Sequence, residues 1–198
     1  MPAVLESRSS QLPADARRKL TRRDCGALAE AGLLDWERFE LIDGELIRKM
    51  PKSRLHSLVL LRLVACLRDI FGQWHVEPEV PINLSAVLDA INEPEPDAIV
   101  LRRPSADFPE ENPGPVDILL VAEVSVTTRE YDLGAKAALY ASAGITEYWV
   151  LDLPASRIVV HRHPDGDRYS SIVAYGIDEP VSPLAAESAS IHLQDLLN

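Results

Sequence analysis

Residues 117–126 read DILLVAEVSV, an apolar run that contains one charged side chain after its first residue, Glu123. A continuous apolar run of this length predicts a β-strand that is buried on both faces, at the centre of a sheet. Residues 127–143 then predict a helix that ends at Gly144, and residues 148–153 predict another strand. This strand, helix and strand in succession indicate an α/β domain.

Helix caps, glycines and prolines divide the rest of the chain into short elements. Thr127-Thr128-Arg129-Glu130 matches a capping box at the start of the helix just described. The other expected elements are a helix over 21–31, a hairpin of strands 39–42 and 45–47 around Asp43-Gly44, a helix over 55–71 between Ser53 and Gly72, an edge or bulged strand over 74–84, a strand over 97–101, a proline-rich surface loop over 102–116, a hairpin of strands 158–161 and 169–173 around the turn 163–166, and a last apolar turn near Leu193.

Two of these elements carry specific expectations about burial. Leu, Val, Ile or Ala occupies nearly every side of the helix over 55–71, which predicts a deeply buried helix. In the first hairpin, Phe39, Leu41 and Leu46 are expected to point inward, and Glu40 and Glu45 are the polar alternates.

The domain organisation follows from the same survey. Residues 1–20 are rich in Ser, Pro and Arg and predict a flexible N-terminal tail, and residues 21–198 predict one domain. We expect an α/β fold in which helices flank a mixed β-sheet, with an N-terminal β-hairpin.

The charge balance argues against a general nucleic-acid binder. The chain has 198 residues, with 20 Lys plus Arg, 31 Asp plus Glu and a net charge of -11. Phosphate contacts need positive charge, and residues 55–198 hold 9 basic against 22 acidic side chains. The first 54 residues hold 11 basic and 9 acidic side chains, so any DNA is expected on this part of the chain. Its relevant cations are Arg17, Arg18, Lys19, Arg22, Arg23, Arg48, Lys49, Lys52 and Arg54.

Several features lead us to expect a cytoplasmic protein. Cys25 and Cys66 fit no zinc or redox spacing and are expected to be reduced. The N-terminus lacks the apolar run of a signal peptide. Residues 55–71 are too short and too charged to span a bilayer, so no membrane is expected as a partner.

Glu123 and Asp97 are the candidate metal ligands. A carboxylate in a strand buried on both faces is unfavourable by several kcal/mol unless it is paired or binds a metal. Asp97 opens the short strand DAIVL, and if this strand neighbours residues 117–126, the two carboxylates converge. Together with phosphate oxygens and water they suit Mg²⁺. The alternatives are that Glu123 lies in water or pairs with Arg129, and that Asp97 belongs to an acidic loop.

Lys136 is the candidate catalytic cation, because it is the single lysine after residue 52. It shares a helix face with Asp132 and Tyr140 at a spacing of four residues. Over the two carboxylates, its ammonium could orient or deprotonate a water or stabilise a phosphoryl oxygen. The alternative is a surface pair of Asp132 with Lys136, worth a few tenths of a kcal/mol.

Four segments, in this order, resemble the PD-(D/E)xK nuclease superfamily and, within it, bacterial restriction-endonuclease-like proteins of the Uma-two type. They are FELIDGEL at 39–46, the helix that opens near His56, EPDAIV at 95–100, and EVS at 123–125 with YDLGAKAALY at 131–140 and AGITEYWVLD at 143–152. The resemblance covers roughly residues 21–153 and extends toward Leu197.

The resemblance implies a restriction-endonuclease-like fold, with Asp97 and Glu123 as metal-binding carboxylates and Lys136 as the lysine of the motif. Ser125 occupies the place where a literal ExK motif has its lysine, so the lysine has moved from the strand to the helix. Glu40 and His56 also match family positions, and both residues, together with Ser125, are expected to border the site. Val126 departs from the pattern, because the family variant with this spacing often has an acidic residue there.

We therefore expect a Mg²⁺-dependent phosphodiesterase that hydrolyses DNA, with Mn²⁺ as a possible substitute. A homodimer is also expected, since cutting both strands of a duplex favours two symmetric sites. The first alternative is a binding or scaffold module that keeps the nuclease fold with weak or no catalysis. The second is a hydrolase with Ser125 as nucleophile, which the missing G-x-S-x-G elbow disfavours.

Overall fold

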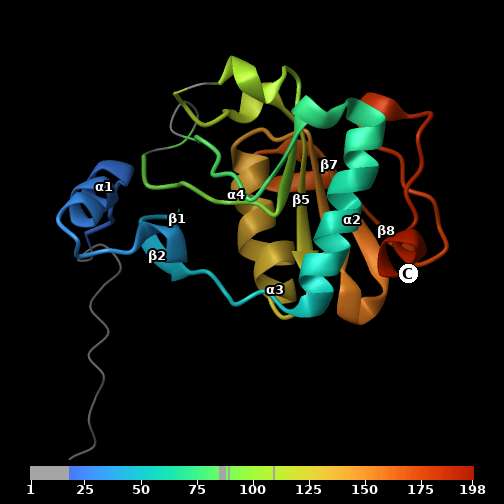
Figure 1. Cartoon of the computed structure of the whole chain (residues 1–198), viewed down its shortest axis with the longest axis horizontal. Helices are drawn as coiled ribbons and strands as arrows, with labels where there is room; N and C mark the ends of the chain where they lie inside the picture. The colour runs from blue at the N-terminus through green and yellow to red at the C-terminus, as the bar shows by residue number, and fades with distance from the viewer. Residues whose placement is uncertain (1–17, 85–87, 89, 109) are drawn as a thin grey trace, which may run out of the picture.

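The computed structural model describes residues 18–84, 88, 90–108 and 110–198. Within these ranges the strands form a six-stranded sheet in the order β3-β4-β5-β6-β7-β8 and a separate two-stranded hairpin, β1-β2 (Figure 1). The strands are β1 Phe39–Ile42, β2 Glu45–Arg48, β3 Val76–Pro78, β4 Ala98–Leu101, β5 Ile118–Ser125, β6 Glu147–Asp152, β7 Arg157–Asp165 and β8 Arg168–Gly176. The α-helices are α1 Arg22–Glu30, α2 Arg54–Phe71, α3 Arg129–Tyr131, α4 Ala137–Ser142 and α5 Leu193–Leu197.

The apolar strand β5 lies inside the sheet, as its sequence predicts. It pairs antiparallel with β4 and parallel with β6. All of its residues but one are buried, because both faces of the strand are covered. The predicted mixed α/β sheet and the predicted N-terminal hairpin are therefore both confirmed.

Helices cover both faces of the sheet and divide the core into two layers. On one face, α2 and α5 pack against alternate residues of the central strands, including Leu120, Ala122 and Trp149. On the other face, α4 packs against the intervening residues, including Val121 and Tyr148. In Figure 1 the central strand β5 runs between the ribbons of α2 and α4. Because neighbouring side chains on a strand alternate, each strand contributes to both layers.

Helix α2 was expected to be deeply buried, and this expectation is wrong. Ser53 caps the helix by accepting a hydrogen bond from the His56 N–H, and Gly72 follows its last residue, as predicted. Leu63 is fully buried, but Leu61 is 67% exposed. The helix thus lies on the surface with one apolar face toward the sheet, although its sequence is apolar on more than that face.

The helix after β5 differs from the expected single helix over 127–143. It consists of α3, a π-helical turn over Asp132–Lys136 (η6) and α4, and Gly144 follows it. The predicted capping box does not form, because the N-cap is Thr128 rather than Thr127 and makes no side-chain capping bond. Instead the Thr128 hydroxyl donates to Asp132 at 2.5 Å. Short π-helical turns are frequent at functional sites.

Two further elements differ in extent from their sequence predictions. The strand expected over 74–84 is reduced to β3, which lies at the edge of the sheet as its prolines indicate. The last hairpin forms, but its pairing continues to Asp165 opposite Arg168. Its turn is therefore Gly166-Asp167, beyond the predicted position.

The N-terminal part forms a small unit around the first hairpin. Thr21 and Asp24 form a capping box that begins α1. Leu41 of β1 exchanges two backbone hydrogen bonds with Glu93, which ties the hairpin to the segment that leads into β4. The predicted flexible tail over residues 1–20 falls mainly on residues 1–17, which lie outside the described residues.

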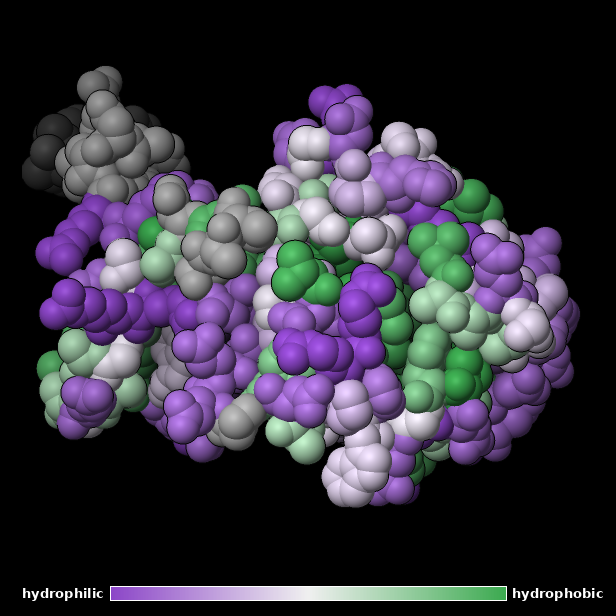
Figure 2. All heavy atoms as spheres, turned by 90° about the horizontal axis from the view of Figure 1, so that it is seen from above, coloured by the Kyte–Doolittle hydropathy of each residue, from purple (hydrophilic) through white to green (hydrophobic). Residues whose placement is uncertain are grey.

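The surface carries no single large apolar area on the face that Figure 2 shows, where hydrophobic side chains form scattered patches among hydrophilic ones. No helix in the described part of the chain has the length and the hydropathy needed to cross a membrane. Cys25 is buried, Cys66 is half-buried, and both are free thiols.

Candidate active site

Strand register brings the two predicted metal ligands together. In the antiparallel pair β4-β5, Ala98 lies opposite Ala122. One more step along this register places Asp97, which immediately precedes β4, opposite Glu123. Both side chains are buried, with exposed fractions of 8% and 4%. The expectation that strand 97–101 neighbours residues 117–126 is thus confirmed.

Asp97 is held by three contacts from three parts of the chain. Its Oδ2 accepts the Val124 backbone N–H at 2.7 Å and lies 3.0 Å from Nε2 of His56. Its Oδ1 lies 3.3 Å from Nζ of Lys52. Burial acts to raise the pKa of Asp97, but the His56 contact, the Val124 N–H and the Lys52 charge together hold it below its ordinary value. Asp97 is therefore a fixed carboxylate.

Glu123 is held by the helix that follows its own strand. Its Oε1 accepts hydrogen bonds from Nζ of Lys136 at 2.7 Å and from the Tyr140 hydroxyl at 3.1 Å. Burial raises the pKa of Glu123 well above its ordinary value. The Lys136 charge lowers this pKa, and the negative charge of Asp97 raises it by a smaller amount. The predicted shared face of Lys136 and Tyr140 is thus directed at Glu123, and neither of the alternatives for Glu123 is seen.

Lys136 lies between two carboxylates, one of which comes from the N-terminal hairpin. Its Nζ lies 3.3 Å from Oε2 of Glu40, in addition to its contact with Glu123. Burial acts to lower the pKa of Lys136, but Glu123 and Glu40 together raise it above its ordinary value. The lysine is therefore a buried ammonium group rather than a base. The alternative, a surface pair with Asp132, is absent among the ion pairs of the described residues.

Glu40 was expected to be a polar residue that points outward from the hairpin, and this expectation is wrong, because only 8% of Glu40 is exposed. It does border the site, as the family resemblance implies. Its Oε2 also accepts the Glu95 backbone N–H at 3.2 Å. The hairpin lies against the site rather than against water on this face, so the residue that alternates with Leu41 is buried as well.

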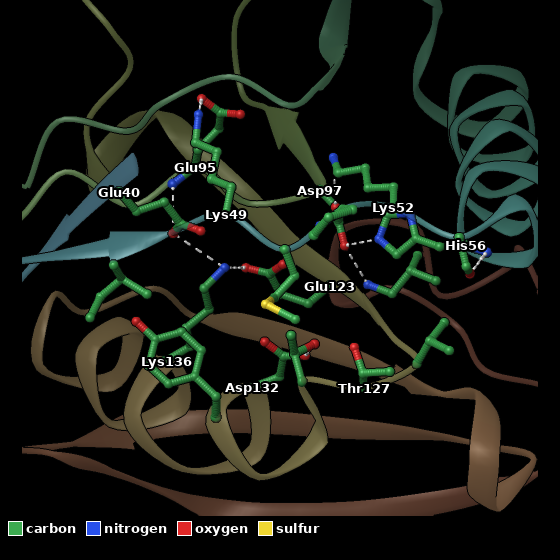
Figure 3. A pocket seen from close by; sticks show the side chains of 18 of the residues that line it. Glu40, Lys49, Lys52, His56, Glu95, Asp97, Glu123, Thr127, Asp132 and Lys136 are labelled. Atoms are coloured by element: carbon green, nitrogen blue, oxygen red, sulfur yellow. Dashed lines mark hydrogen bonds and ion pairs between the residues drawn. The ribbon is translucent and has the colours of Figure 1, made fainter. Parts of the chain in front are cut away.

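The candidate residues surround a cavity of about 400 Å³. In Figure 3, Glu123 and Asp97 lie at its centre, Glu40 and Lys136 on one side, and Lys52 and His56 on the other. All six of these residues line the cavity, but Ser125 does not. Ser125 is fully buried in β5 opposite Asp152. Its side chain acts on Asp132, which does line the cavity, so Ser125 lies behind the cavity wall, and a nucleophilic role for it gains no support.

Three further residues of the site were not predicted. Lys52 was counted only as a surface charge, yet it contacts Asp97, and its own pKa is raised because Glu79 and Asp97 outweigh the effect of burial. Tyr131 and Asp132 also line the cavity. Burial raises the pKa of Tyr131 to about 12 and also raises that of Asp132. The sequence signal for Asp132 was its spacing from Lys136 on one helix face, but no role in the site was assigned to it.

The donor set fits a hard divalent cation such as Mg²⁺. Two buried carboxylates lie opposite each other, and both contacts recorded for Glu123 involve Oε1. Among the described residues, no group of three or more His, Cys, Asp or Glu side chains is arranged to hold a metal. Mg²⁺ is commonly bound through one or two carboxylates, with water and phosphate oxygens as its other ligands. Asp97 and Glu123 supply this number.

Comparison with known proteins agrees with the fold and with the motifs. The profile of the Uma2 family, described as "Putative restriction endonuclease", matches residues 30–194. The solved structure of a "putative nuclease belonging to DUF820" from Anabaena variabilis ATCC 29413 has a similar fold, with a TM-score of 0.63 and 16% sequence identity. The similarity covers 85% of this chain and 94% of that one. The search of curated proteins gives no match.

Proposed function

Because this chain belongs to the Uma2 family of restriction-endonuclease-like proteins, we propose that it is a Mg²⁺-dependent endonuclease that hydrolyses DNA phosphodiester bonds. The family and the fold support a nuclease. The metal and the DNA substrate are inferred from the site. The observation that carries them is the placement of Asp97 and Glu123 opposite each other in one cavity, with Lys136 bonded to Glu123 at 2.7 Å.

Each residue of the site has a distinct task in this proposal. Asp97 and Glu123 would hold the divalent ion. When bound, such an ion polarises a phosphate and lowers the pKa of a coordinated water. Lys136 keeps its positive charge between Glu123 and Glu40. It therefore offers an ammonium group that orients the attacking water or stabilises the negative charge on the phosphoryl oxygens, and it does not act as the base.

Hydrogen bonds from neighbouring groups hold the two carboxylates in place. The Val124 N–H and His56 orient Asp97, while Tyr140 and Lys136 orient Glu123. Such support matters because electrostatic stabilisation requires groups that are already oriented before the reaction. A homodimer in the cytoplasm remains part of the proposal, because two symmetric sites suit the cutting of two strands.

A plasmid-nicking assay with Mg²⁺, Mn²⁺ or EDTA tests the proposal. We expect the wild type to convert supercoiled plasmid to nicked or linear DNA with either metal and to be inactive in EDTA. Asp97→Ala should lose this activity, whereas Asp167→Asn, a change at an exposed turn, should keep it. A wild-type protein that is inert with both metals, or an active Asp97→Ala variant, would refute the proposal.

One observation favours a second candidate, a nuclease-fold binding module without efficient catalysis. The Glu123 oxygen that contacts Lys136 and Tyr140 is already satisfied by the protein itself. Metal titration separates the two functions. A nuclease should show a thermal midpoint that rises with Mg²⁺ in the wild type but not in Asp97→Asn, and a module without a metal site should show no such difference.

A further inference from the structure

The segment Arg48-Lys49-Met50-Pro51-Lys52-Ser53-Arg54, here called the mouth segment, joins the hairpin to α2 along the rim of the cavity. It carries four cations in seven residues, and every residue from Arg48 to Ser53 lines the cavity. It crosses the site between the hairpin that holds Glu40 and the helix that holds His56. It therefore supplies a continuous part of the cavity wall.

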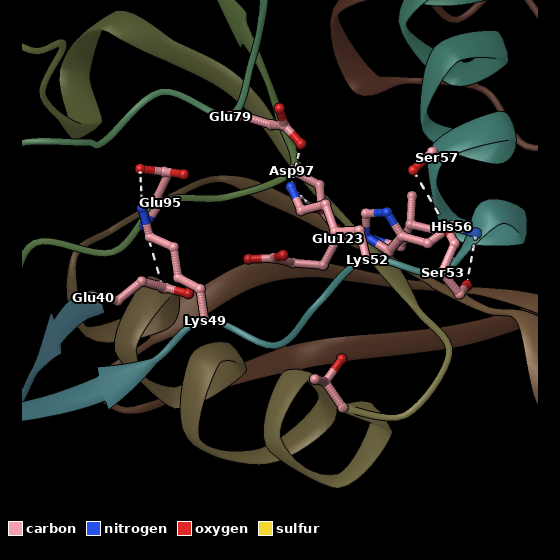
Figure 4. A network of polar contacts seen from close by, with 12 residues as sticks. Glu40, Lys49, Lys52, Ser53, His56, Ser57, Glu79, Glu95, Asp97 and Glu123 are labelled. Atoms are coloured by element: carbon pink, nitrogen blue, oxygen red, sulfur yellow. Dashed lines mark hydrogen bonds and ion pairs between the residues drawn. The ribbon is translucent and has the colours of Figure 1, made fainter. Parts of the chain in front are cut away.

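The two lysines of the mouth segment are already neutralised by the protein. Lys49 pairs with Glu95 at 2.6 Å, and Lys52 pairs with Glu79 and with Asp97. Figure 4 shows Lys49 and Lys52 directed at these carboxylates. Their charges thus hold the segment onto the body of the protein and offset its acidic groups.

The two arginines of the mouth segment have no such partners. Within the part of the chain that the structure describes, neither Arg48 nor Arg54 takes part in an ion pair or a side-chain hydrogen bond, and both side chains are exposed. A guanidinium group presents several donors in a planar fork that suits phosphate. One such group lies at each end of the segment: Arg48 lines the cavity, and Arg54, the first residue of α2, directly follows the lining residue Ser53.

Three of the other N-terminal cations that were expected to bind DNA differ from this pair, whereas Arg23 of α1 is exposed and takes part in no ion pair or side-chain hydrogen bond among the described residues. Arg18 pairs with Asp24, Lys19 with Asp43, and Arg22 with Glu93. These contacts neutralise their charges within the α1 and hairpin unit. Arg23 does not line the cavity, so the unpaired cations beside the cavity are those of the mouth segment, and Arg17 lies outside the described residues.

We propose that the mouth segment binds the sugar-phosphate backbone of one nucleic-acid strand, with Arg48 and Arg54 each contacting a phosphate at its own end of the segment. This inference rests on the proposed function and names the residues that hold its substrate. Seven extended residues span at most roughly 20 to 25 Å, and strand phosphates are spaced by about 3.4 Å along a duplex axis. The segment therefore covers a stretch of several nucleotides.

The negative charge of the rest of the protein makes the two proposed arginine-phosphate contacts important for binding. The net charge of -11 repels a phosphate backbone at long range, and the cavity itself is lined by Glu40, Asp97, Glu123 and Asp132. Binding then depends on a few local cations rather than on the overall field. Each arginine-phosphate contact releases condensed counterions, so its loss changes the salt dependence of binding by a defined amount.

Fluorescence anisotropy with a labelled 20-base-pair DNA duplex at several salt concentrations, with Ca²⁺ in place of Mg²⁺, tests this inference. The double variant Arg48→Gln/Arg54→Gln should bind about tenfold to hundredfold more weakly in 0.1 M salt than the wild type. The slope of log K against log salt should become shallower by about 2, or about 1 for each arginine. Because both side chains are exposed and unpaired, the thermal midpoint should not change.

The matched control is Arg168→Gln, at the start of β8. The Arg168 side chain is 79% exposed. The other end of β8, at Gly176, is the end that lies in register with the last residues of β6 and β5, next to the site. Arg168 therefore lies at the end of β8 that is far from the site. This variant should keep the wild-type affinity and slope. A double variant that keeps both the wild-type affinity and slope overturns the inference, and so does a control that weakens binding as much as the double variant.

Plasmid nicking separates this outcome from a failure of the proposed function. If the wild type cleaves plasmid while the double variant binds like the wild type, the proposed function stands and the mouth segment is not the binding surface. If the wild type neither cleaves plasmid nor binds the duplex, both proposals are wrong.

Discussion

Asp97 accepts the backbone N–H of Val124 at 2.7 Å, and this bond fixes the Asp97 carboxylate beside its register neighbour Glu123. The two acidic groups come from different strands, so their separation is set by the sheet rather than by a flexible loop. Several measurable consequences follow from this arrangement and from the core that supports it.

Replacing Asp97 by Asn tests the metal site with little change in shape. The amide oxygen can still accept the Val124 N–H, but the negative charge is lost. We expect cleavage to fall by at least about a hundredfold and the Mg²⁺-dependent rise in thermal midpoint to disappear. Differential scanning fluorimetry across a Mg²⁺ titration measures the second effect. Asp167→Asn, whose side chain is largely exposed, should respond to Mg²⁺ like the wild type.

Removing the buried cation should destabilise the protein and leave two unpaired carboxylates. The side chains of Lys136 and Glu123 are 6% and 5% exposed, and breaking a buried pair in this way costs about 3–5 kcal/mol. Lys136→Met should therefore lower the free energy of unfolding by this amount near pH 8, measured by urea denaturation. The double variant Lys136→Met/Glu123→Gln should recover much of the stability but no activity.

The pH dependence of the Lys136→Met variant has a definite sign. Burial already raises the pKa of Glu123 in the folded state, and loss of the Lys136 charge raises it further. When the pKa of an acid is higher in the folded state than in the unfolded state, the folded protein loses stability as the pH rises above the unfolded-state pKa. The loss of stability should thus be smaller at pH 5 than at pH 8. An equal loss at both values would contradict the assignment of Glu123 as the uncompensated charge.

His161 should make the wild-type stability fall on mild acidification. It is 2% exposed beside Tyr148 and Tyr169, and burial lowers its pKa from the ordinary value of 6.5. Below about pH 6.5 the unfolded chain takes up a proton that the folded chain resists, so stability decreases as the pH falls. His161→Phe should flatten this part of the stability profile in urea denaturation between pH 7 and 5. The exposed His163→Asn should leave the profile unchanged.

Core packing of α2 can be tested on two leucines of the same helix. Leu63 is fully buried, whereas Leu61 is 67% exposed. Leu63→Ala should lower the free energy of unfolding by about 2–5 kcal/mol, because it removes buried methyl groups and leaves a cavity. Leu61→Ala should change it by less than about 0.5 kcal/mol. Similar losses in both variants would show that this helix is buried on more than one face.

The sequence identified those parts of the fold whose signals are local. Glu123 was found because a charge inside an apolar strand is unusual, and the hairpin at Asp43-Gly44 was found from its turn. The convergence of Asp97 with Glu123 needed one assumption, that their strands are neighbours, and the register confirms it. The uniformly apolar sequence of α2 was misleading, because exposed apolar residues such as Leu61 are common on protein surfaces.

The missed parts of the site depend on contacts between distant segments. Glu40 alternates with apolar residues as a solvent-facing residue does, and only its contact with Lys136 shows that this face is covered. Lys52 lies 45 residues before Asp97 in the sequence, so its contact with that carboxylate has no local signal. The roles of Asp97, Glu123 and Lys136 in catalysis stay predictions.

Among the strands that the structure describes, β5 and β6 form the only parallel pair, and the connection between them carries Lys136. A chain emerging from the ribosome contains both site carboxylates once residue 123 has been made, but its lysine is still to come. Such a chain lacks the cation that pairs with Glu123 in the folded protein. The site is completed only when the crossover helix packs down and β6 joins the sheet. Under the proposed function, a chain that ends before residue 136 is therefore expected to lack nuclease activity.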